Sequence, residues 1–292
     1  MRQIISIPYR IFLIVNTVFL TAVSICCLLP IVHILAVSLS GQGPANANLV
    51  GLVPVEPTFQ AYAESLNDIK MLRALGQSVM RVAVGVPVNM LLTILCAYPL
   101  SFNRDEFPGR NKYMWLVFFT MLFSGGLIPY YILINQLKLI DTVWALVLPG
   151  IPVFNVIILM NFFRQLPKEL KESAFIDGAS YPTVLLKIFL PLSTPALATL
   201  TLFCFVGHWN SWFDGLIYMH KMELYPLQTY LQSLVNKMNS SPDLEEAKRL
   251  AFIARRSMLF AKIFIAIVPI MVVYPYMQKY YQTGLVLGSV KG

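Results

Sequence analysis

Three charged side chains stand inside or near long apolar stretches of the sequence, where a charge is costly and needs a partner. They are Arg81, Asp214 and Lys262, each about one to two helical turns from the end of its stretch. A structural role would be an ion pair between two of them, or a long side chain that reaches a membrane interface. A functional role would be the lining of a polar cavity. There Arg81 and Lys262 would suit an anionic sugar, because guanidinium and ammonium groups pair with carboxylates.

A second candidate is the aromatic cluster around Asp214, in the run Gly207–Tyr218 (GHWNSWFDGLIY). Aromatic faces beside amide and carboxylate groups are the side chains that sugar recognition requires. Tryptophan and tyrosine at the end of a membrane helix are also typical of an interfacial belt. The segment WNSWFD concentrates too much polarity for a lipid-facing surface, which favours the cavity. The candidate substrate-path residues are therefore Arg81, Trp209, Asn210, Trp212, Asp214 and Lys262.

Signatures of enzyme and metal sites are absent from the sequence. There is no G-x-x-x-x-G-K-[ST] loop that would bind ATP, no H-E-x-x-H pair and no Cys/His cluster. His33, His208 and His220 lie far apart, and the cysteines lie within apolar runs without disulfide or metal-ligand spacing. We therefore expect no catalytic residue, no metal site and no cofactor bound by this chain.

The elements that must position these residues are apolar helices. The chain of 292 residues is 57% hydrophobic and only 12% charged, against about 25% charged residues in ordinary globular proteins. Asp, Glu, Lys and Arg are absent from residues 11–55, 82–103, 113–137, 142–163 and 188–213, and residues 257–278 contain only Lys262. Each window supplies the roughly 20 apolar residues that cross a bilayer as a helix. Short alternating segments typical of transmembrane β-strands are absent.

The sequence thus predicts an all-α, polytopic membrane protein with six transmembrane helices in a single transmembrane domain, residues 1–292. The predicted spans are about 12–38, 72–100, 113–134, 143–163, 192–218 and 257–281. The net charge of +8 comes from basic residues scattered at span ends, where lipid phosphates and membrane orientation account for them. We expect membrane lipids as neighbours and no nucleic acid.

Six spans place both termini and the segment 166–191 on one face of the membrane. Arg104, Arg110, Arg164 and Lys168 lie in short loops of that face, whereas the opposing short loop offers Lys138, so we expect the first face to be cytoplasmic. The loop before the last span opposes this orientation, because it would place four further cations outside: Lys248, Arg249, Arg255 and Arg256.

The segment 166–191 (LPKELKESAFIDGASYPTVLLKIFLP) is a long polar interruption between two apolar runs, where a turn of a few residues would suffice. Lys168–Asp177 is rich in helix-forming residues, and Gly178 is a natural C-terminal stop. Ser180 can cap a second helix that carries Pro182 in its first turn. The sequence predicts a compact helix pair that projects from the membrane; a plain interfacial connector is the alternative.

A resemblance to a known family gives this segment a role. Glu172–Ala179 (ESAFIDGA) followed by Ile188–Pro191 (IFLP) resembles the EAA motif of ABC-importer permeases. That motif reads E-A-A, then three residues and a glycine, then a hydrophobic-Leu-Pro ending; Ser173 replaces the first alanine. The resemblance implies the type I ABC importer permease fold, with this segment as a coupling helix that sits in a cleft of a cytoplasmic ATPase.

The likeness covers nearly the whole chain. It extends to the runs His33–Ser40, Ala97–Ser101, Phe123–Pro129, Gly207–Tyr218 and Tyr274–Gly292. These runs are similar to the carbohydrate branch of the family, the oligosaccharide permeases that include the LplC-like type and the alginate-oligosaccharide importers. The resemblance implies a heterodimer with a second homologous permease, two ATPase subunits that bind ATP and Mg, and an extracytoplasmic solute-binding protein.

The resemblance also assigns residues to ATPase coupling. Lys171 and Glu172 are expected to make polar contacts with the ATPase, and Ala174 and Gly178 to allow a close fit. The full set of expected coupling residues is Lys171, Glu172, Ala174, Asp177, Gly178, Ala179 and Pro191.

The resulting hypothesis is a permease subunit of an ATP-driven importer in the bacterial inner membrane. It would move oligosaccharides, with anionic, alginate-type chains as the specific expectation, by alternating access. The alternative is an ion-coupled secondary transporter of sugars. Such a protein is expected to carry several intramembrane acids and inverted repeats, whereas Asp214 is the one acid within a predicted span.

Overall fold

The computed structural model describes residues 7–148, 152–239 and 256–289, and every regular element in these ranges is helical. The predicted all-α fold class is therefore confirmed. The internal contacts divide the chain into two compact units. The single transmembrane domain of residues 1–292 stays a prediction. Unit 1 comprises residues 1–71 and 233–268, and unit 2 comprises residues 72–232 and 269–292. Lys248, Arg249 and Arg255, which bear on the predicted orientation, lie outside the described residues.

Among the described residues, three helices are long and apolar enough to cross a membrane. They are α1 (Ile7–Ser38), α4 (Ile69–Ser101) and the part of α16 (Arg256–Ser289) up to Tyr276. At about 1.5 Å per residue, α1 and α4 exceed the roughly 30 Å of a hydrocarbon core. Their positions agree with the predicted spans 12–38, 72–100 and 257–281.

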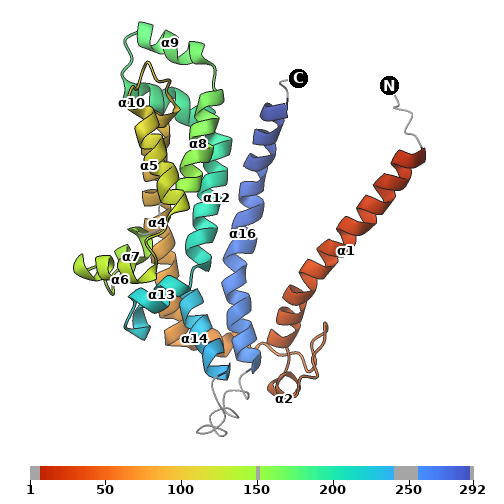
Figure 1. Cartoon of the computed structure of the whole chain (residues 1–292). Helices are drawn as coiled ribbons and strands as arrows, with labels where there is room; N and C mark the ends of the chain where they lie inside the picture. Colours follow the sequence, from red (N-terminus) through yellow and green to blue (C-terminus); the bar gives the residue numbers. More distant parts are fainter. Residues whose placement is uncertain (1–6, 149–151, 240–255, 290–292) are drawn as a thin grey trace. The chain divides into compact units, whose positions relative to one another are not determined.

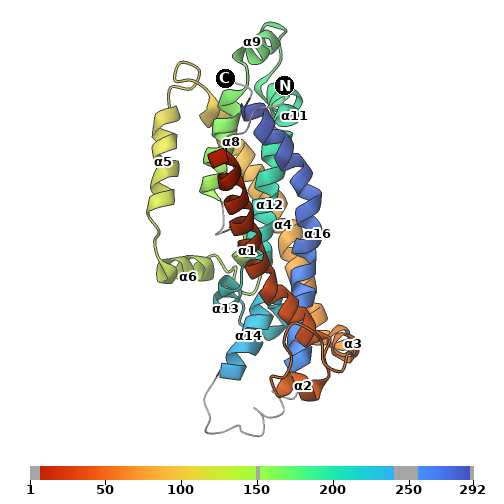
Figure 2. The same cartoon turned by 90° about the vertical axis from the view of Figure 1, so that its right-hand side faces the viewer.

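The predicted span 113–134 is broken in the structure. It consists of α5 (Arg110–Leu122) and α6 (Leu127–Gln136), which meet at an angle of 113°, and Figure 2 shows α6 running across the direction of α5. Gly126 has φ +85°, a conformation that glycine adopts at little cost. The helical pattern therefore stops at the two glycines rather than passing through them.

Two further predicted spans are shorter helices than expected. The region 143–163 holds α7 (Val143–Val147) and α8 (Val153–Gln165), with Pro152 as the N-cap of α8. The region 192–218 holds α12 (Thr194–Asn210) and α13 (Phe213–Tyr218), which are separated at Ser211 and Trp212. Within the described residues, length and composition support up to five spans if each bent pair counts as one, with α8 as a shorter apolar helix.

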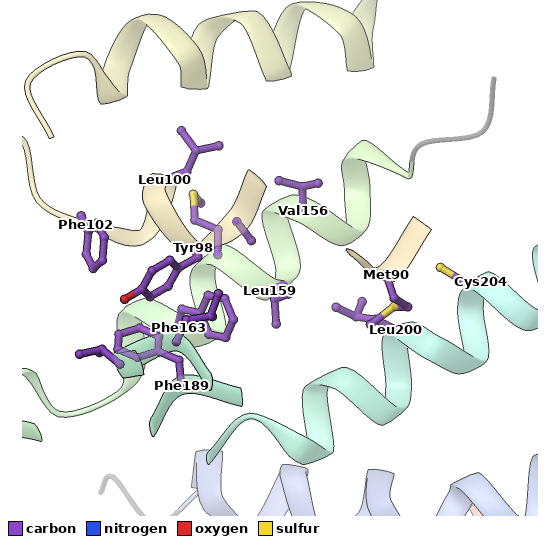
Figure 3. Packing of buried hydrophobic residues seen from close by; sticks show 14 residues of the cluster. Met90, Tyr98, Leu100, Phe102, Val156, Leu159, Phe163, Phe189, Leu200 and Cys204 are labelled. Atoms are coloured by element: carbon purple, nitrogen blue, oxygen red, sulfur yellow. The ribbon is translucent and has the colours of Figure 1, made fainter. Parts of the chain in front are cut away.

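Unit 2 has a core of buried side chains from α4, α8, α12 and the segment 181–192. Tyr98, Phe163 and Phe189 meet edge to face, with ring centroids 5.1 to 6.3 Å apart (Figure 3). The Tyr98 hydroxyl also donates a 2.9 Å hydrogen bond to the carbonyl oxygen of Tyr181. Each edge-to-face ring pair contributes about 0.5–1.5 kcal/mol, so these contacts join the end of α4 to the segment 181–192.

Unit 1 is built on the C-terminal end of α1 with α2 (Gln42–Asn46), α3 (Gln60–Asn67) and the first half of α16. Ala36, Val37, Ala45 and Val50 form a small buried cluster against Phe260. Lys262 of α16 forms an ion pair with Asp68, just after α3. The rest of α1 is unburied: none of the residues in its most apolar window is covered by this chain.

Candidate functional site

The segment 166–191 forms a helix pair at one end of unit 2, with its first helix, α9, beyond the end of α8 (Figure 1). The first helix, α9, spans Lys168–Ile176, and Gly178 follows it with φ +80°. The amides of Gly178 and Ala179 bond back to Phe175 and Ala174 at 3.0 and 2.9 Å, which closes the helix end. The predicted helix–glycine–helix plan is confirmed.

The second helix of the pair is less regular than predicted. It comprises α10 (Tyr181–Val184), a π-helical turn (Leu185–Phe189) and α11 (Leu190–Leu192). Ser180 has the extended backbone of an N-cap, but its hydroxyl bonds the Thr183 hydroxyl at 2.9 Å instead of a backbone amide. Pro191 is exposed in α11, and the whole helical stretch Tyr181–Leu192 meets α12 at 83°.

One face of α9 is held against unit 2. Lys171 is only 7% exposed, forms an ion pair with Glu106 and places its ammonium 4.9 Å from the centre of the Phe102 ring. Ala174 and Ala179 pack against the core of the same unit. The side chain of Lys171 therefore anchors α9 to its own chain.

The other face of α9 is exposed. Glu172, Asp177 and Gly178 are all exposed, and Ile176 beside them is 86% exposed. A β-carbon added at Gly178 would meet no atom within 4 Å. An isoleucine that contacts almost nothing at the tip of a projecting helix is a natural contact for a partner protein. Sequence reasoning missed Ile176, although it lies inside the recognised motif.

Both members of the anchoring ion pair lie outside the apolar spans: Glu106 is in the loop that precedes α5, and Lys171 is on α9. Partial burial raises the pKa of Glu106, but the hydrogen bond and charge of Lys171 outweigh burial and leave that pKa below its ordinary value. Glu106 is thus ionised wherever a free glutamate is ionised, and the pair persists below the ordinary carboxyl range.

A polar cavity of about 380 Å³ lies in unit 2, lined by α4, α7, α8, α12 and α13. Its polar lining residues are Arg81, Asn89, Asn155, His208, Ser211 and Asp214. Figure 1 places α13, which carries Asp214, far from α9 along the long helices of this unit. Polar side chains within apolar spans cost free energy, so their concentration here indicates that they either serve function or hold the helices together.

Arg81 joins the helices around this cavity. Its guanidinium binds Asp214 through both terminal nitrogens, at 3.1 Å for Nη1. Nη1 and Nη2 also donate to the carbonyl oxygens of Ser211 and Leu146, at 3.4 and 3.3 Å. Nε donates to Nδ1 of His208 at 3.5 Å. A guanidinium has five N–H donors, and these contacts employ all of them.

His208 packs directly on the backbone of α4. A β-carbon added at Gly85 would lie 2.6 Å from its Nε2, so only glycine permits this approach. Nδ1 accepts from Arg81, and Nε2 lies 2.8 Å from the Asn89 amide. The Asn89 atom nearest to Nε2 is Nδ2. Because arginine is always a donor, a neutral His208 carries its proton on Nε2, and this tautomer requires the Asn89 carboxamide to be turned so that its oxygen faces the ring.

The structure brings some of the predicted path residues together and separates others. Arg81 and Asp214 form the ion pair that was one of the two structural alternatives, and both line the cavity. Trp209 is buried and stacks on Phe205, while Asn210 is exposed. Trp212 packs edge to face on Phe213, and none of Trp209, Asn210 and Trp212 lines the cavity. Lys262 belongs to unit 1, where it pairs with Asp68.

Sequence reasoning missed most of the uncharged lining. Asn89 and Asn155 are carboxamides inside charge-free windows, and that contrast was the available signal. His208 was visible only as one of three isolated histidines. Within the described ranges, no group of three or more His, Cys, Asp or Glu side chains could hold a metal ion.

Comparison with known proteins identifies the family. Residues 61–285 match the family described as "Binding-protein-dependent transport system inner membrane component". The chain is 39% identical over 284 residues to Protein LplC of Bacillus subtilis, covering 97% of this chain and 96% of that protein. It is 37% identical over 276 residues to the polygalacturonan/rhamnogalacturonan transport system permease protein YtcP of the same organism, covering 94% and 96%.

A solved structure supports the same assignment. It is a chain of a bacterial ABC transporter involved in the import of the acidic polysaccharide alginate, with a TM-score of 0.84 and 32% sequence identity. The match covers 94% of this chain and 98% of that chain. These likenesses favour the ABC permease over the secondary transporter. The chain belongs to the binding-protein-dependent transport family and is a non-catalytic, inner-membrane permease subunit of an ABC importer.

Proposed function

We propose that this permease imports oligosaccharides that contain uronic acids. The relative YtcP is named for polygalacturonan, and the similar solved structure for alginate; both polymers consist of uronic acids. Arg81 and Lys262 each neutralise a carboxylate of this chain, so recognition of a uronate charge is not assigned to them. The support for the acidic class is the chain-wide likeness to these two proteins.

The partners follow from the family. A second, homologous permease completes the membrane unit, two cytoplasmic ATPases bind ATP and Mg, and an extracytoplasmic solute-binding protein delivers the sugar. Both termini and the helix pair lie in the cytoplasm in this arrangement. The unburied apolar residues of α1, such as Phe12 and Phe19 at 60% and 63% exposed, are suited to lipid or to the second permease.

The observation that carries the coupling role is the two-faced geometry of α9. Its outer face, with Ile176 and Asp177, enters the ATPase cleft. Its inner face is fixed to the rest of unit 2 through Lys171, Glu106 and the aromatic core. A displacement of the tip is therefore transmitted to α4 and α8, which line the cavity, and alternating access follows from closure of the ATPase pair.

Purification of the chain with its associated subunits tests the assembly, and uptake into proteoliposomes tests the cargo. We expect an ATPase pair and a second permease to co-purify, and ATP-dependent uptake of trigalacturonate in the presence of the binding protein. An isolated homo-oligomer that takes up sugar on an ion gradient without ATP would contradict the proposal.

A further inference from the structure

We propose that the polar cavity of unit 2 is a sugar-binding subsite of this subunit, which recognises the hydroxyl groups of a pyranose ring through Asn155. Arg81 serves as its scaffold and not as a receptor for the sugar's carboxylate. The inference rests on the proposed function in one respect, namely that the cargo is an oligosaccharide.

The first step is the charge balance of the cavity. Arg81 is 3% exposed and has all five of its N–H donors committed to Asp214, His208 and two carbonyl oxygens. A carboxylate of the cargo would find no donor on this guanidinium and would face Asp214, a like charge. The cavity is thus suited to uncharged, hydroxylated parts of a ligand.

The second step is the hydrogen bonding of the Asn155 side chain. This residue is 4% exposed, and its side chain lines the cavity from α8. Its Nδ2 donates to the Cys204 sulfur at 3.4 Å, and a thiol is a weak acceptor. A carboxamide buried in an apolar span is costly unless it is well hydrogen-bonded. It offers two donors and two acceptor positions, which match neighbouring hydroxyls of a sugar ring.

The third step is the remaining lining. The Ser211 hydroxyl donates to Asp214 at 2.8 Å and keeps acceptor capacity, and the Asp214 side chain is 24% exposed. Phe203 is 47% exposed and presents an aromatic surface to the cavity. An apolar surface with a few fixed polar groups in about 380 Å³ falls within the usual range of small-molecule sites, about 300–1,000 Å³.

The test uses the assembled importer in proteoliposomes with two probes, trigalacturonate and its fully methyl-esterified, uncharged counterpart. The variants are Asn155→Leu, which keeps the volume, and Asn155→Ala, which cannot clash.

We expect each variant to lower the sugar transported per ATP hydrolysed by about tenfold, because a buried ligand loses one or two hydrogen bonds. The loss should be the same for both probes, since hydroxyls and not charges are recognised. ATP hydrolysis stimulated by the loaded binding protein should stay within about twofold of the wild type, because the ATPase contacts lie on α9.

Asn161→Leu is the matched control, because Asn161 lies on the same helix but is exposed and outside the cavity lining. An unchanged sugar-to-ATP ratio in both Asn155 variants would overturn the subsite, as would a loss confined to the charged probe. A parallel fall of transport and ATP hydrolysis in both variants would show a structural role and would also overturn it. If the wild-type importer takes up neither of the two probes, the proposed function is refuted instead.

Discussion

Lys171 of α9 is ion-paired with Glu106 of the loop between α4 and α5, and its ammonium lies over the ring of Phe102. These two charged residues are 65 positions apart in the sequence. Their contact joins the projecting helix to the end of α4, whose other half lines the polar cavity. The pair is therefore a polar link between the surface that we propose as the ATPase docking site and the helices that enclose the cavity.

Glu106→Gln should weaken this link. The pair is partly exposed, so it contributes only ~0.5–1 kcal/mol, and we expect about a threefold loss of transport with the complex still assembled. Sugar uptake into proteoliposomes, divided by the amount of assembled complex, measures this loss of transport. Glu169→Gln is the control, since Glu169 is exposed on the same helix. Equal transport in the two variants would refute the link.

The same pair predicts a pH dependence. Because the pKa of Glu106 is lowered in the folded protein, the pair stabilises the fold above the ordinary carboxyl range. That stabilisation is lost as the pH falls through the lowered pKa. The Tm of the wild-type complex should thus exceed that of Glu106→Gln at neutral pH and converge with it in acid. A Tm difference that is constant with pH would contradict the assignment.

Ile176→Ala should weaken ATPase binding by about tenfold, the usual effect of truncating a central apolar contact. Ile176 is 86% exposed, so the stability of the isolated permease should not change. Titration of the ATPase onto permease-containing nanodiscs measures the affinity. Leu170→Ala is the control, because Leu170 is also exposed on α9, at 43%. An affinity equal to that of this control would mean that Ile176 lies outside the docking surface.

Gly85→Ala should lower the free energy of unfolding by about 1–3 kcal/mol, because the new methyl group would overlap the His208 ring. Gly76 lies on the same helix with no atom within 4 Å of its added β-carbon. Gly76→Ala should instead stabilise α4 by about 0.5–1 kcal/mol. Thermal unfolding of the two variants in detergent measures the contrast. Similar Tm shifts for both would show that the close approach of His208 to α4 is not required.

The sequence predicts those parts of the fold in which one local pattern decides the outcome. The spans at α1, α4 and α16 follow from charge-free runs, and the helix pair at 166–191 follows from Gly178 between two helix-forming stretches. The break between α5 and α6 was not predicted, because Gly125 and Gly126 permit a bend without requiring one. In the bent form Ile134 of α6 is buried in a cluster with Ala145 and Tyr218, a long-range contact that no local pattern reveals.

The charged residues of the candidate site could be predicted from the sequence, but their contacts could not, because these contacts depend on the fold. Arg81 and Asp214 are conspicuous as charges in apolar surroundings, yet they lie 133 positions apart, and only the fold pairs them. The cluster WNSWFD straddles the break between α12 and α13, so its side chains point in several directions instead of sharing one helical face. Trp209 is buried as a result, while Asp214 reaches the cavity.

The central claim is that this chain conducts oligosaccharides with energy received through α9. The most direct measurement is simultaneous uptake of trigalacturonate and release of phosphate by the reconstituted importer, with wild-type Ile176 and with Ile176→Ala. The account predicts ATP-dependent uptake that falls together with stimulated ATP hydrolysis in the variant. Uptake that needs no ATP, or that is unchanged when Ile176 is truncated and the ATPase no longer binds, would contradict it.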